Sequence, residues 1–99
     1  MLAKSKHSGG PRLDIHGAFV RRANLSGASL RSAILDGADA TNALFKDADF
    51  AEASMRGTIL RGADLSGAKN LTIDQLSSAV IDASTILPGY IDRSRLISK

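Results

Sequence analysis

An alanine recurs at every fifth residue from Ala23 to Ala53, in the stretch ANLSGASLRSAILDGADATNALFKDADFAEA. Divided into units of five from Leu13 to Gly67, the chain has alanine at nine of eleven first positions and an apolar residue at all eleven third positions. The second, fourth and fifth positions are mostly Asp, Asn, Ser, Arg and Gly. A period of five fits neither common element, because the apolar stripe of a helix repeats every ~3.6 residues and a strand alternates every ~2.

The pattern instead predicts a coil in which each five-residue unit forms one side and ends in a bend. First and third positions then point inward, and successive coils stack through backbone hydrogen bonds at ~4.8 Å. The first position lies near a corner, where room is short, so a small residue is needed there. The third position fills the middle of the coil.

The A-[DN]-L-x-x pattern, clearest in ANLSG at 23–27 and ADLSG at 63–67, resembles that of the pentapeptide repeat family. The resemblance covers residues 13 to 67 and implies a right-handed coil with four units per turn. We therefore expect an all-β solenoid, a right-handed quadrilateral β-helix of under three coils, over residues 13–70. Leu13, Ala40 and Thr58 depart from the pattern and predict local irregularity.

The segment 71–99 predicts a short capping α-helix followed by a tail. In LTIDQLSSAV, Thr72 and Gln75 have the spacing of a capping box, and Leu71 can pack on Leu76 as a hydrophobic staple. We expect an apolar side on this helix, made by Leu76, Ala79 and Val80. An open β-helix end exposes core and unpaired edges, so this helix is expected to cover the C-terminal end. Pro88-Gly89 predicts a turn.

Composition and charge narrow the function classes. The sequence contains no cysteine and no apolar run near the ~18 residues that a membrane span needs, and it starts without the apolar segment of a signal peptide, so a cytoplasmic protein is expected. The formal charge of +3 comes from the ends: residues 1–12 carry three bases and no acid, whereas residues 13–67 carry six bases and seven acids. We interpret residues 1–12 as a mobile basic tail.

The sequence gives poor support for catalysis, a metal site or a cofactor. His16 has one acidic neighbour, Asp14, and a solvated surface histidine is the favoured interpretation. Aspartate is a routine second-position residue of this repeat, so Asp39, Asp49 and Asp64 do not indicate paired catalytic carboxylates. We expect a protein that is not an enzyme.

Two classes of function remain open. The first is a scaffold or adaptor that presents a flat face to another protein, with a homodimer as a further possibility. The second, implied by the family resemblance, is a DNA mimic that inhibits a topoisomerase such as DNA gyrase. Mimicry needs a dense negative surface, and the repeat carries a net charge of only −1 (six bases, seven acids). Direct binding of nucleic acid is disfavoured, because no basic stripe is combined with stacking aromatic residues.

Four second positions, which point outward, are apolar instead of polar: Phe19, Ile34, Leu44 and Ile59. Stacking by about twenty residues places Phe19, Asp39 and Ile59 in one outward column, with arginines at the fourth and fifth positions of the same side. Exposed apolar residues beside arginines are typical of protein interfaces. The candidate protein-binding face therefore consists of Phe19, Arg21, Arg22, Ile59 and Arg61, and we expect it to bind an acidic protein surface or a second copy of the chain.

Overall fold

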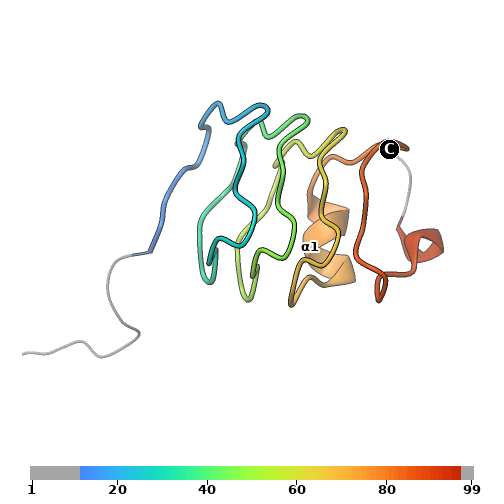
Figure 1. The fold of residues 1–99 in the computed structure, drawn as a ribbon. Coiled ribbons are helices and arrows are strands. Elements are labelled where there is room, and N and C mark those ends of the chain that lie inside the picture. Colours follow the sequence, from blue (N-terminus) through green and yellow to red (C-terminus); the bar gives the residue numbers. More distant parts are fainter. Residues whose placement is uncertain (1–11, 97–99) are drawn as a thin grey trace, which may run out of the picture.

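The computed structural model describes residues 12–96, and Figure 1 shows the chain wound into a stack of open coils. Second-position residues twenty apart form parallel β-bridges: Asp14 with Ile34, and Ile34 in turn with Ser54. One turn therefore takes twenty residues, which is four units of five, so the coil has four sides. We name them sides A, B, C and D after the first bridged residue of each, which are Asp14, Phe19, Asn24 and Ser29.

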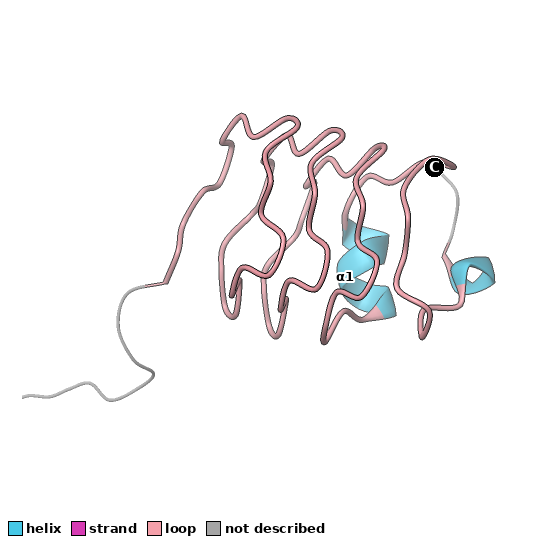
Figure 2. Cartoon of the chain, viewed as in Figure 1, coloured by secondary structure: helices cyan, strands magenta, loops and turns pink. Residues whose placement is uncertain are grey.

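Each side contributes one bridged residue per turn, so Figure 2 shows turns and loops where longer strands would be drawn as arrows. The chain bends after every fifth residue, which leaves no room for a continuous strand. At the bridged residue both backbone groups point toward the preceding coil. Ile34 N–H donates to the Leu13 carbonyl at 2.8 Å, and the Ile34 carbonyl accepts from Ile15 N–H at 2.9 Å.

The corners explain the alanine period. At each corner a first-position N–H donates to the preceding third-position carbonyl, as Ala18 N–H does to Ile15 at 2.9 Å. The fifth position has a positive φ in every unit from Gly17 to Gly67. At Gly67 a side chain would also collide, since an added Cβ would lie 2.1 Å from Asp47 Oδ1. The residue after this tight bend points into the coil, and alanine fits there.

Third-position side chains fill the core in the predicted register. Leu25, Phe45 and Leu65 stack on side C, and the Phe45 and Phe50 ring centroids lie 5.4 Å apart. The irregularity expected at Ala40 and Thr58 does not occur, because the ladder through Asp39 and Ile59 is unbroken. Thr58 is buried in an alanine position, and its hydroxyl donates to the Leu35 carbonyl at 2.7 Å.

Helix α1 spans Ile73–Ser78, and the predicted capping box of Thr72 and Gln75 is confirmed. The predicted apolar side was wrong in one respect: Ala79 and Val80 lie beyond the helix. Val80 N–H donates to the Thr58 carbonyl at 2.8 Å and its carbonyl accepts from Leu60 N–H at 2.7 Å, so Val80 extends side B. A short 3-10 helix, η2, spans Arg93–Arg95.

Side C also continues past residue 70, because Ile86 bridges Asp64. The segment TILPG at 85–89 repeats the form of TILRG at 58–62. The likeness extends to the contacts: Thr85 is buried and donates to the Leu60 carbonyl at 2.8 Å, as Thr58 does to Leu35. Both repeat-like segments, 79–84 and 85–89, went unrecognised in the sequence, because α1 and one extra residue break the period of five.

Candidate protein-binding face

The candidate face is the outer surface of side B. Bridges connect Phe19 to Asp39, Asp39 to Ile59 and Ile59 to Val80, so the expected outward column of Phe19, Asp39 and Ile59 is present. Phe19 is 73% exposed, whereas Ile59 and Val80 are partly buried. The face is thus apolar at both ends and carries one carboxylate between them.

Arg21 holds this column together through two contacts. Its Nε donates to Asp39 Oδ2 at 2.8 Å, and its guanidinium carbon lies 4.7 Å from the centroid of the Phe19 ring. Thr41 Oγ1 donates to the other oxygen of Asp39 at 2.6 Å. The Thr41 hydroxyl and then Arg21 lower the pKa of Asp39, so this carboxylate stays ionised at neutral pH.

Arg22 and Arg61 are the two arginines of the face that form no ion pair in the described residues. Both side chains are exposed. Arg22 has a φ of 61°, a conformation that favours glycine. Side B therefore offers two free guanidinium groups, while Arg21 is already engaged within the chain.

The neighbouring side C carries further exposed apolar residues at second positions. Leu44 is 38% exposed and Ile86 is 50% exposed. Leu44 was among the apolar second positions expected from the sequence, whereas Val80 was expected on the helix and Ile86 was not singled out. The signal that could have found these two was the return of the pattern in AVIDA at 79–83 and TILPG at 85–89.

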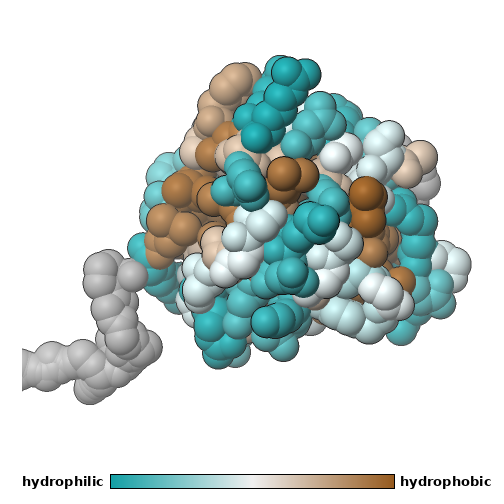
Figure 3. Space-filling view, viewed as in Figure 1, coloured by the Kyte–Doolittle hydropathy of each residue, from teal (hydrophilic) through white to brown (hydrophobic). Residues whose placement is uncertain are grey.

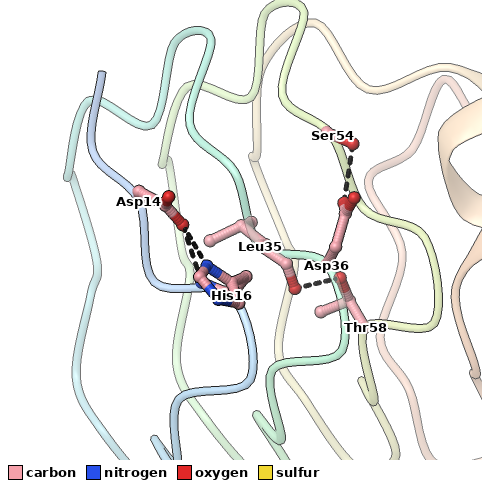
Figure 4. A network of polar contacts seen from close by, with 6 residues as sticks. All are labelled: Asp14, His16, Leu35, Asp36, Ser54 and Thr58. Atoms are coloured by element: carbon pink, nitrogen blue, oxygen red, sulfur yellow. Dashed lines mark hydrogen bonds and ion pairs between the residues drawn. The ribbon is translucent and has the colours of Figure 1, made fainter. Parts of the chain in front are cut away.

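Side A carries polar contacts within one unit and between neighbouring coils. His16 Nδ1 lies 2.7 Å from Asp14 Oδ1, and Ser54 Oγ donates to Asp36 Oδ1 at 2.6 Å (Figure 4). Asp14 raises the pKa of His16, and His16 lowers the pKa of Asp14. Both residues of the first pair are exposed, so solvent screens their interaction.

Two other features are absent from the described residues. In residues 12–96, no group of three or more His, Cys, Asp or Glu side chains is arranged to hold a metal ion. No helix in the same range has the length and apolar character needed to cross a bilayer. The column on side B therefore remains the site of interest.

A family model described as pentapeptide repeats matches residues 13–47 with eight copies. No curated protein gives a significant match. Among solved structures, the chain is similar to a pentapeptide repeat protein, Rfr23, from the cyanobacterium Cyanothece, with 27% identity and a TM-score of 0.68; the match covers 78% of this chain and 52% of that one.

A second similar structure is a pentapeptide repeat protein of the Arabidopsis thaliana thylakoid lumen. The identity is 30% and the TM-score 0.57, and the match covers 78% of this chain and 56% of that one. This chain thus spans about half the length of the two solved proteins. These matches confirm the resemblance inferred from the repeat and show the fold, a right-handed, four-sided β-helix.

Proposed function

Because this chain is a pentapeptide repeat protein, we propose that it is a non-enzymatic scaffold that binds another protein through side B. The observation that carries the proposal is the column of Phe19, Ile59 and Val80 beside two unpaired arginines. Arginine and aromatic residues are enriched at protein interfaces, and apolar side chains at the surface beside them, here the exposed Phe19 and the partly buried Ile59, provide the anchors. Phe19 and Ile59 are the anchors, and Arg22 and Arg61 select an acidic partner surface and set its orientation.

The internal pairing supports a rigid binding face. Arg21 fixes the Phe19 ring from one side and is itself fixed by Asp39. A side chain that is already ordered loses less conformational entropy when it binds. The partner therefore meets an aromatic anchor in a fixed position.

The alternative, a DNA mimic that inhibits a topoisomerase, has less support. Mimicry requires carboxylates that are free to imitate phosphates. Arg21 neutralises Asp39, and Arg31 Nη1 donates to Asp49 Oδ2 at 3.1 Å. Two of the outward aspartates are thus screened by bases of the preceding coil.

We also propose that residues 71–96 close the C-terminal end as a cap, extending the solenoid by a partial turn beyond the eleven units. Tyr90 hydroxyl donates to the Ala68 carbonyl at 2.6 Å and accepts from Leu71 N–H at 3.0 Å. Leu87, Ile91 and Leu96 pack against the core from this segment. These contacts support a cap made by the whole segment, with α1 as one part of it.

The test is capture of a partner from the native host with purified full-length chain as bait. We expect the double variant Phe19→Ser, Ile59→Ser to lose the partner. The controls Leu44→Ser, an apolar loss on side C, and Arg31→Ser, a charge loss on side D, should retain it. If the double variant keeps its fold and captures the same partner as the wild type, side B is not the binding face.

A further inference from the structure

The first coil leaves a regular set of backbone groups without partners. In later coils the second-position N–H and C=O bond to the coil before them, as at Ile34. Among residues 12–96 the same groups of the first coil have no backbone partner; they belong to Asp14, Phe19, Asn24 and Ser29. In the middle of each side of the first coil, one residue therefore has both its N–H and its C=O free in the described part of the chain. These groups point away from the second coil, out of the N-terminal end.

The core is open at the same end. Ile15, Val20 and Leu25 are only partly buried, whereas Leu35, one coil later on side A, is 2% exposed. Figure 3 shows hydrophobic surface gathered at the end nearest the start of the chain.

A donor and an acceptor on one residue are what a hydrogen-bonded pair in an antiparallel ladder requires. A second copy, turned end to end by a two-fold axis, supplies antiparallel strands with the same spacing on all four sides at once. We propose that this edge binds a second copy of the chain, giving a head-to-head dimer joined through its first coils. This inference depends on the fold and does not require the partner proposed for side B, although Phe19 and Arg22 belong to both surfaces.

Of the two axes that pass through the middles of opposite sides, charge favours one. An axis through sides A and C would place Asp14 against the partner's Asp14, which is unfavourable. An axis through sides B and D places Phe19 and Ser29 each opposite its own counterpart, and Asp14 opposite the partner's Asn24. The second arrangement also brings Asp14 diagonally next to the partner's Arg22, two residues before that asparagine. The guanidinium group of Arg22, which forms no ion pair within residues 12–96 of its own chain, then lies close to the Asp14 carboxylate of the other copy.

The first experiment measures the mass of the full chain in solution by light scattering over a range of concentrations. We expect a dimer that dissociates on dilution. Asp14→Arg alone and Arg22→Asp alone should each weaken it about ten-fold, because two attractive pairs become repulsive, and the double variant should restore it. Lys46→Glu, one coil away, is the control and should leave the dimer unchanged.

The second experiment uses the absence of cysteine from the sequence. Residues in a hydrogen-bonded antiparallel pair have Cα atoms about 5.5 Å apart, within the range of a disulfide. Ser29→Cys should therefore form a cross-linked dimer on mild oxidation, much faster than Lys69→Cys on the same side two coils away. Asp14→Cys alone should not cross-link.

Three results would overturn the proposal. These are a monomer at every concentration, equal cross-linking of Ser29→Cys and Lys69→Cys, or rapid cross-linking of Asp14→Cys alone. The two outcomes are separated by Ile59→Ser alone, which leaves the first coil intact and should not change the mass, whereas the double variant also alters Phe19 at the proposed dimer edge. A dimer with no captured partner would reject the proposed function and keep this inference.

Discussion

Gln75 forms hydrogen bonds with both the oxygen and the nitrogen of its side-chain amide, and the two sets of bonds have different structural roles. Its Oε1 accepts from Thr72 N–H at 2.9 Å, which completes the capping box. Its Nε2 donates to the carbonyls of Phe50 and Ala53 at 2.9 and 3.1 Å. The same side chain therefore starts α1 and fastens it to the coil before it.

Gln75→Glu separates these two roles. The carboxylate keeps an acceptor for Thr72 N–H but loses the donors, and it faces two carbonyl oxygens instead. We expect the free energy of unfolding at neutral pH to fall by about 1–3 kcal/mol, measured by urea denaturation. The loss should shrink near pH 3, where a protonated glutamate can donate again. An unchanged midpoint at neutral pH would mean that the contacts to Phe50 and Ala53 contribute nothing.

Asp49 is the outward carboxylate with the strongest set of partners. Asn70 Nδ2 donates to Oδ1 at 2.9 Å and is the largest cause that lowers the pKa of Asp49 to about 2, with Ala51 N–H and Arg31 adding to it. A carboxyl whose pKa is lower in the folded state stabilises the fold above its unfolded value of 3.8. That contribution is lost as the pH falls from about 4 to about 2.

Asn70→Ala should therefore raise the pKa of Asp49 toward 3.8, as followed by the carboxyl carbon shift in an NMR titration. The acid limb of the stability curve should move to higher pH in the same variant. Arg31→Ser should also raise the pKa, because the hydrogen bond and the charge of Arg31 both lower it. An unchanged pKa in Asn70→Ala would contradict the assignment of the Asn70 hydrogen bond as the largest cause.

At the scale of elements, the eleven regular units could be predicted and the last turn could not. A five-residue period with an inward first and third position is compatible with few backbones, so the core register followed from it. The four units per turn were implied by the family resemblance. The segments 79–84 and 85–89 were missed because α1 and one extra residue put them out of phase. The pairing of Arg21 with Asp39 was also missed, because stacking by twenty places residues on a common side but does not say which side chains bond across coils.

The C-terminal segment gives the prediction at this scale. Deleting residues 71–99 removes α1, Val80, Ile86 and the contacts of Tyr90, and it exposes the edges of the last coil. We expect aggregation or new end-to-end association, detected by light scattering, because unpaired edges recruit other chains. Deleting residues 1–11, which lie outside the described residues, should leave the denaturation midpoint nearly unchanged. A truncated chain of unchanged midpoint and unchanged mass would exclude the capping role.

At the scale of the whole molecule, one register decides which residues form the core and which are offered to a partner. Third positions such as Phe50 point inward, and second positions such as Phe19 point outward. The column on side B and the unpaired edge of the first coil both follow from that assignment. An error of one residue in the phase would exchange core and surface along the whole chain.

The phase is tested most directly by one comparison of unfolding free energies, that of Phe50→Ala against Phe19→Ala. Phe50 is 0% exposed and Phe19 is 73% exposed. We predict a loss of about 3–5 kcal/mol for Phe50→Ala, with Phe45→Ala similar, because each leaves a cavity in the core. For Phe19→Ala, measured at a concentration low enough to keep the chain monomeric, we predict a loss of about 0.5 kcal/mol or less. Equal losses, or a larger loss for Phe19→Ala, would contradict the register.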